Sequence, residues 1–121
     1  MQVDLTNYKN MYLQTSKEYL DKIQIDLDKL FEDPLDKTAL GDLHVSSHSL
    51  RGESQVMKFT EIYNLCMGIE SAARNALETS TQLNSQAILD MKETLGNLRK
   101  MVRKIEDGSI SVQSDTENAK I

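Results

Sequence analysis

The sequence contains few residues that interrupt a helix or cross-link a chain. One proline and five glycines occur among 121 residues, so long segments are free of helix breakers. Cys66 is the only cysteine, which excludes an internal disulfide and a site built from several thiolates. A single thiol suits a reducing compartment, where we expect Cys66 to pack as a small apolar residue.

Positive charge and long apolar runs are also scarce. Lys and Arg total 14 against 19 Asp and Glu, and the formal net charge of −5 argues against binding to nucleic-acid phosphates. No segment approaches the roughly 20 consecutive apolar residues that a membrane span requires. Residues 1–7 also lack the basic-then-apolar order of a signal peptide. We therefore expect a cytoplasmic protein with no nucleic-acid partner and no membrane insertion.

Apolar residues recur at intervals of three and four, which predicts helices and no strands. We expect helices at about 7–32, from Pro34 to about 56, at about 60–79, and from beyond Ser85 to Gly108. Thr6 or Asn7, then Asp33 and Thr60, are the expected caps of the first three helices. The expected buried stripes are Tyr8, Tyr12, Tyr19, Ile23, Leu27 and Leu30; Leu40, Leu43, Ser47, Leu50, Ser54 and Met57; Ile62, Leu65, Cys66, Ile69, Ala72, Ala73 and Ala76; and Ile88, Met91, Leu95, Leu98, Val102 and Ile105.

Four amphipathic helices joined by short connections predict an all-α, antiparallel up-and-down four-helix bundle. The bundle occupies residues 1–107 in this interpretation, and the chain is too short to hold a second catalytic domain. Residues 108–121 have no apolar stripe. We expect them to form a disordered tail or the start of a linker.

His48 is the residue that points to chemistry. At 100° per residue, the centre of the second helix's buried stripe lies about 130° around the helix from His48, so the imidazole should face solvent. Arg51 and Gly52 lie one turn further on the same surface. Glycine inside a helix costs about 1 kcal/mol relative to alanine, so Gly52 suggests space left for another protein. Arg51 could hold phosphoryl oxygens with its planar fork of donors.

The segment His48-Ser49-Leu50-Arg51-Gly52 resembles the signature of the histidine phosphotransfer (HPt) family: histidine, any residue, apolar, basic, glycine. The likeness is greatest to CheA-type phosphotransfer domains and extends over about residues 5–106, including Asp33-Pro34-Leu35-Asp36 and the four-helix layout. The resemblance implies that His48 is phosphorylated on Nε2. It also implies that Glu70, 22 residues later, hydrogen-bonds the imidazole ring and orients it.

The resemblance further implies a phosphoryl carrier in two-component signalling of the chemotaxis type. His48 would accept the group from a histidine kinase catalytic domain, in cis or in trans, and pass it to an aspartate of a CheY-like receiver domain. The chain has no phosphate-cradling glycine loop and no nucleotide-binding boxes. No cofactor is therefore expected in this chain, and ATP and Mg²⁺ are expected on the partner domains.

Several positions depart from the family pattern. Arg51 stands where lysine is usual, Lys58 where glycine is frequent, and Met67 where CheA-like domains have a second partner of the ring. His44 occupies a position that is commonly apolar or aromatic, and its role stays open.

Several alternatives remain open at this level. His44 and His48 have a spacing that can chelate zinc, but no third ligand pattern accompanies them. A helical adaptor bundle that binds proteins without chemistry shares all the periodicity arguments. Whether the chain acts as an enzyme, and whether it is a free-standing relay protein or a piece of a larger CheA-type kinase, also stays open.

Overall fold

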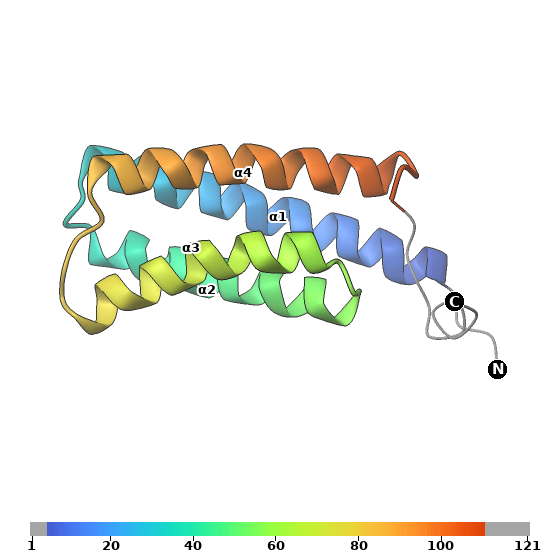
Figure 1. Cartoon of the computed structure of the whole chain (residues 1–121), viewed down its shortest axis with the longest axis horizontal. Helices are drawn as coiled ribbons and strands as arrows, with labels where there is room; N and C mark the ends of the chain where they lie inside the picture. Colours follow the sequence, from blue (N-terminus) through green and yellow to red (C-terminus); the bar gives the residue numbers. More distant parts are fainter. Residues whose placement is uncertain (1–4, 111–121) are drawn as a thin grey trace.

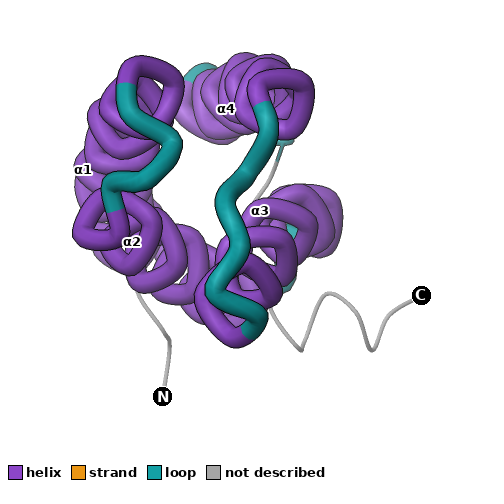
Figure 2. Tube along the Cα trace, turned by 90° about the vertical axis from the view of Figure 1, so that its left-hand side faces the viewer, coloured by secondary structure: helices purple, strands orange, loops and turns teal. Residues whose placement is uncertain are grey.

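The computed structural model describes residues 5–110, and this part of the chain forms four helices and no strand. The helices are α1 (Leu5–Glu32), α2 (Lys37–Val56), α3 (Thr60–Glu78) and α4 (Ser85–Glu106). They run alternately up and down (Figure 1) and surround a common interior when viewed along the bundle (Figure 2). The predicted all-α four-helix bundle is confirmed.

The core consists largely of the predicted stripes. All six residues predicted for the fourth helix are buried, as are Leu40, Leu43, Ser47, Leu50 and Ser54 of α2. Tyr8 is the clear exception, because its side chain is 53% exposed. The first turns of α1 extend beyond the end of the α2–α3 pair, so no neighbouring helix covers this stretch (Figure 1). The prediction that Tyr8 is buried is wrong for that reason.

The caps differ from the sequence-based expectation. Asp36 caps α2 by accepting a hydrogen bond from the backbone N–H of Ala39 at 3.0 Å. Asp33 instead accepts from the N–H of Leu35 at 3.1 Å, so the Asp33–Asp36 segment forms a turn before the helix begins. The prediction that Asp33 caps this helix, with Pro34 in its first turn, is wrong by three residues.

The first and third helices also begin differently from the prediction. Thr6 and Asn7 lie inside α1, so neither occupies a cap position. Phe59 precedes α3 and makes no side-chain capping hydrogen bond, while Thr60 is the first residue of the helix. Phe59 is buried and its ring lies 5.1 Å from that of Tyr12. Apolar packing therefore secures the start of α3 in place of a polar cap.

A buried hydrogen bond ties α1 to α2. The hydroxyls of Tyr12 and Ser54 lie 2.8 Å apart, and both side chains are buried. Burial raises the pKa of Tyr12 well above its ordinary value, so its hydroxyl stays protonated. The small residues in the α2 seam thus leave room for a tyrosine from α1 and satisfy its hydroxyl.

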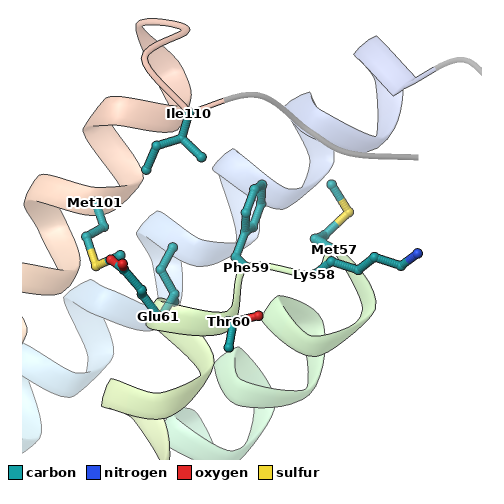
Figure 3. Close-up of a pocket in the computed structure, with 8 residues that line it drawn as sticks. Met57, Lys58, Phe59, Thr60, Glu61, Met101 and Ile110 are labelled. Atoms are coloured by element: carbon teal, nitrogen blue, oxygen red, sulfur yellow. The ribbon is translucent and has the colours of Figure 1, made fainter. Parts of the chain in front are cut away.

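The end of the bundle near the α2–α3 turn contains a pocket of about 370 Å³ (Figure 3). Phe59, Met101 and Ile110 line it together with the turn residues Met57 and Lys58. Helix α4 ends at Glu106, just before Gly108, whose φ of 86° is left-handed. The predicted end of the fourth helix at Gly108 is confirmed.

The expectations of no membrane span and of a tail after residue 107 both involve residues outside the described range 5–110. Within residues 5–110, no helix is both long enough and apolar enough to cross a bilayer. Most of the segment predicted to be a tail or linker, residues 111–121, lies outside the described residues. The domain boundary at residue 107 therefore stays a prediction.

Lys58 provides a test of the α2–α3 turn. Its φ is 64°, a left-handed conformation that glycine adopts readily and side chains with a Cβ disfavour. We expect Lys58→Gly to raise the free energy of unfolding by about 0.5–1 kcal/mol. Urea denaturation of both proteins measures the difference. A loss of stability would show that contacts of the lysine side chain outweigh the backbone strain.

Candidate functional site

His48 projects from the exposed face of α2. Its side chain is 57% exposed, whereas Leu50 and Ser47 beside it in the sequence are fully buried. The helical period therefore separates the histidine from the seam as the sequence predicts. The imidazole stands on a rigid helix and is open to a partner from outside.

Glu70 of α3 lies directly behind the imidazole. Its carboxylate is buried, and Oε1 is 2.7 Å from Nδ1 of His48. The two helices are antiparallel, and His48 precedes the turn at Met57 by nine residues while Glu70 follows Phe59 by eleven. At roughly 1.5 Å per residue, both residues lie about 14–16 Å from the turn. The helix pairing therefore brings them to the same level.

The contact with Glu70 determines which nitrogen of His48 carries the proton. A carboxylate can only accept a hydrogen bond, so Nδ1 must donate to Oε1 at 2.7 Å. In the neutral ring, Nε2 then carries the lone pair. Glu70 accepts the Nδ1 proton from the bundle side, and the side chain of His48 is largely exposed. The nucleophilic nitrogen of the ring is therefore Nε2.

Arg51 completes the cluster from one turn further along α2. Its Nε forms an ion pair with Oε2 of Glu70, although the two atoms do not meet with hydrogen-bond geometry. Nη2 lies 3.0 Å from Nδ1 of His48. When Nδ1 donates to Glu70 it offers no lone pair to Nη2, so in this tautomer the 3.0 Å contact is not a hydrogen bond.

The charge state of Glu70 follows from these contacts. Burial by itself raises the pKa of this carboxyl, but the hydrogen bond from His48 and the charge of Arg51 outweigh burial and lower it. Glu70 is therefore ionised at neutral pH. A fixed negative charge beside Nδ1 favours any step in which the ring becomes positive.

Gly52 lies on the same exposed face, next to Arg51. Apart from its chain neighbours and the backbone of its own helix, a Cβ built at this position would meet no atom within 4 Å. The bundle itself therefore does not require glycine here, although glycine lowers the stability of a helix interior. This open space matches the predicted access for a partner, and that role stays a prediction.

His44 lies one turn before His48, and the two rings are nearly parallel with centroids 6.2 Å apart. Its Nε2 is buried and has no hydrogen-bond partner among residues 5–110. In the same part of the chain, no group of three or more metal-binding side chains comes together. Geometry thus gives the His44–His48 pair no third ligand.

Two residues that the sequence did not single out also contact the cluster. The guanidinium of Arg51 lies over the ring of Tyr63, 5.7 Å from its centroid. Arg74, one turn after Glu70 on α3, has its Nη1 3.9 Å from Oε1 of Glu70. Their spacings of seven and four from Glu70 place them on one face of α3, which becomes recognisable only once Glu70 is located.

Comparison with known proteins identifies the family. A sequence model of the Hpt domain matches residues 7–112. The chain belongs to the Hpt domain family. This assignment confirms the resemblance seen in the sequence, and it gives the chain the family's role as a carrier of phosphoryl groups in two-component signalling.

Individual relatives of this Hpt domain are similar over most of its length. The chemotaxis protein CheA of Bacillus subtilis (strain 168) is 27% identical over 106 residues, which cover 88% of this chain and 16% of that protein. The chain thus corresponds to a small part of this curated relative. The CheA phosphotransferase domain from Thermotoga maritima has the same fold, with a TM-score of 0.77 and 23% identity over 82% of this chain and 94% of that one.

The tautomer of His48 tests the geometry without any partner. We expect the neutral ring to carry its proton on Nδ1, because Glu70 accepts that proton, and ¹⁵N NMR of the imidazole measures the distribution. In Glu70→Gln the charge is lost and the Nε2–H tautomer should become substantially populated. The same ring signals in His44→Gln provide the control. A ring of His48 protonated on Nε2 in the unaltered protein would contradict the proposed arrangement.

Proposed function

We propose that His48 of this Hpt domain accepts a phosphoryl group from a histidine kinase catalytic domain and passes it to an aspartate of a CheY-like receiver domain. The single observation that carries the proposal is the hydrogen bond between the exposed imidazole of His48 and the buried, ionised carboxylate of Glu70. ATP and Mg²⁺ belong to the partner domains in this proposal.

The first transfer requires little of this chain beyond position and charge. The Nε2 lone pair of His48 attacks the γ-phosphorus of ATP, a bond from Nε2 to phosphorus forms, and the bond to the bridging oxygen breaks to release ADP. The ring keeps its proton on Nδ1 and becomes positively charged. Glu70 stabilises this charge across the 2.7 Å contact, so no proton needs to leave the ring.

The second transfer reverses the bonding at Nε2. A carboxylate oxygen of the receiver's aspartate attacks phosphorus, the bond from phosphorus to Nε2 breaks, and its electron pair returns to the ring. Arg51 is placed to contact the phosphoryl oxygens during both steps, because its side chain is partly exposed and Nη2 lies beside the ring. Gly52 leaves the space through which the receiver's active site approaches.

Phosphorylation of His48 provides the direct test. Incubated with radiolabelled ATP and the catalytic domain of a CheA-type kinase, the chain should acquire a phosphate that is labile in acid and stable in alkali. His48→Gln should abolish the label, whereas His44→Gln, one turn away, should retain it. A label that persists in His48→Gln would relocate the site. If no competent donor labels the unaltered chain, the adaptor alternative is favoured.

Gly52 tests the approach of the receiver domain. We expect Gly52→Leu to keep the bundle folded, since a side chain here points to open space and leucine favours helix. The leucine side chain should keep the receiver's aspartate from reaching its reactive position. Transfer from phosphorylated His48 should therefore slow by roughly 10-fold or more, since a misplacement of about 1 Å can slow a reaction by about 100-fold. Single-turnover loss of label measures the rate, and Gly52→Ala is the matched control. Unchanged transfer would remove Gly52 from the docking surface.

A further inference from the structure

A second buried carboxylate lies between α1 and α2, away from Glu70. Asp26 of α1 is only 4% exposed, and its Oδ2 has no hydrogen-bond partner among residues 5–110. It lines a pocket of about 370 Å³ together with Asp42 and Ser46 of α2. A buried carboxylate oxygen without a hydrogen-bond donor is unfavourable, so Oδ2 of Asp26 lowers the stability of the fold.

Acidic neighbours affect the pKa of Asp26 more strongly than basic ones do. Burial, with Asp42 and Asp36 nearby, raises the pKa of Asp26 to about 6, and Lys22 and Lys29 oppose this only in part. Lys22 places its ammonium over the ring of Tyr19, 5.5 Å from the centroid. Lys22 and Lys29 both line the same pocket, and neither gives Oδ2 of Asp26 a hydrogen bond within residues 5–110.

The rim of this pocket is apolar and adjoins the surface of His48. Ile25 and Val45 both line the pocket, and they are 52% and 60% exposed. Val45 precedes His48 by three residues on α2, which places the two side chains about 60° apart around the helix. A protein that docks over His48 can therefore also contact Val45 at the opening of the pocket.

A basic side chain fits this pocket better than a metal ion does. Hard divalent cations take six or more oxygen ligands, whereas this pocket offers only two carboxylates and the Ser46 hydroxyl and is also lined by Lys22 and Lys29. Within residues 5–110 no cluster of three metal-binding side chains exists. A guanidinium or ammonium group carries one charge and several donors, and its aliphatic stem can pack against Ile25 and Val45.

We propose that the α1–α2 pocket receives a lysine or arginine side chain of the receiver domain that docks over His48. Asp26 and Asp42 accept hydrogen bonds from the basic group, and Ile25 and Val45 contact its stem. The identity of the partner rests on the proposed function, whereas the chemistry of the pocket rests on the contacts described above.

The pocket itself is tested with agmatine, an alkyl guanidinium, by NMR titration of the full chain. We expect saturable shifts at Ile25, Val45 and Ser46 with a Kd in the millimolar range, and a fall in the pKa of Asp26, because a bound cation favours its charged form. Asp26→Asn should abolish the saturable shifts. Asp28→Asn, which removes the same charge from an exposed residue paired with Lys92, should retain them.

Two outcomes of the titration overturn the proposal. Identical agmatine shifts in Asp26→Asn would show that the cation binds elsewhere on the acidic surface. Saturable shifts at the same residues with Mg²⁺, and none with agmatine, would assign the pocket to a metal ion. Thermal unfolding of both variants accompanies the titration, and we expect Asp26→Asn to be at least as stable as the unaltered chain because it removes a buried charge.

A second measurement separates this inference from the proposed function. Each chain is first phosphorylated on His48 with phosphoramidate, a small donor that needs no docking, and is then mixed with the receiver domain at increasing concentrations. Asp26→Asn should load normally but require roughly 5- to 10-fold more receiver for half-maximal transfer, whereas Asp28→Asn should match the unaltered chain. Failure to load His48 in the unaltered chain contradicts the proposed function. Normal loading with unchanged receiver dependence in Asp26→Asn contradicts the pocket.

Discussion

The site depends on one hydrogen bond between two helices, from Nδ1 of an exposed histidine to a carboxylate that is almost completely buried. A carboxylate in that position is stable only because His48 and Arg51 both contact it, and together they keep it ionised despite burial. The same contact holds the ring in one tautomer. Protein packing thereby fixes the chemistry of Nε2 before any partner arrives, which is the preorganisation that a phosphoryl carrier needs.

The bundle supplies the rigidity on which this arrangement relies. Helices α2 and α3 are joined by a three-residue turn, so their relative register is closely constrained, and Glu70 cannot slide past His48 without disturbing the seam of small residues. The buried Tyr12–Ser54 hydrogen bond further ties α2 to α1. The exposed face around His48 contains few functional groups: the imidazole of His48, the guanidinium of Arg51 and the backbone at Gly52, which has no side chain. This small set of groups is consistent with the proposed function, in which the partner domains supply the nucleotide, the metal and the accepting aspartate.

The two buried carboxylates found among residues 5–110, Glu70 and Asp26, differ in their surroundings. Glu70 is surrounded by donors from α2 and α3 and has a lowered pKa, whereas Asp26 faces other acids across the α1–α2 seam and has a raised one. Burial is similar in the two cases, so the difference lies in their partners. Glu70 has a hydrogen bond from His48 and an ion pair with Arg51, whereas Oδ2 of Asp26 has no hydrogen-bond partner within residues 5–110 and lies below an apolar rim near His48. The second environment is therefore suited to a donor brought by another protein.

The sequence by itself determined the fold class, the exposure of His48 and the family, because these depend on helical periodicity and on a short local motif. It placed the end of α4 correctly at Gly108 but misplaced the start of α2, since Asp33 and Asp36 are both good capping residues and only the turn geometry selects between them. It also placed Tyr8 in the core, because periodicity does not reveal where neighbouring helices end. The family resemblance pointed to Glu70 as the partner of His48, but only the tertiary structure decided the geometry of that contact. It also decided that Tyr63 and Arg74 join the cluster and that Oδ2 of Asp26 is buried without a donor. These facts depend on the register between helices far apart in the chain, where a shift of one or two residues turns a side chain from one neighbour to another.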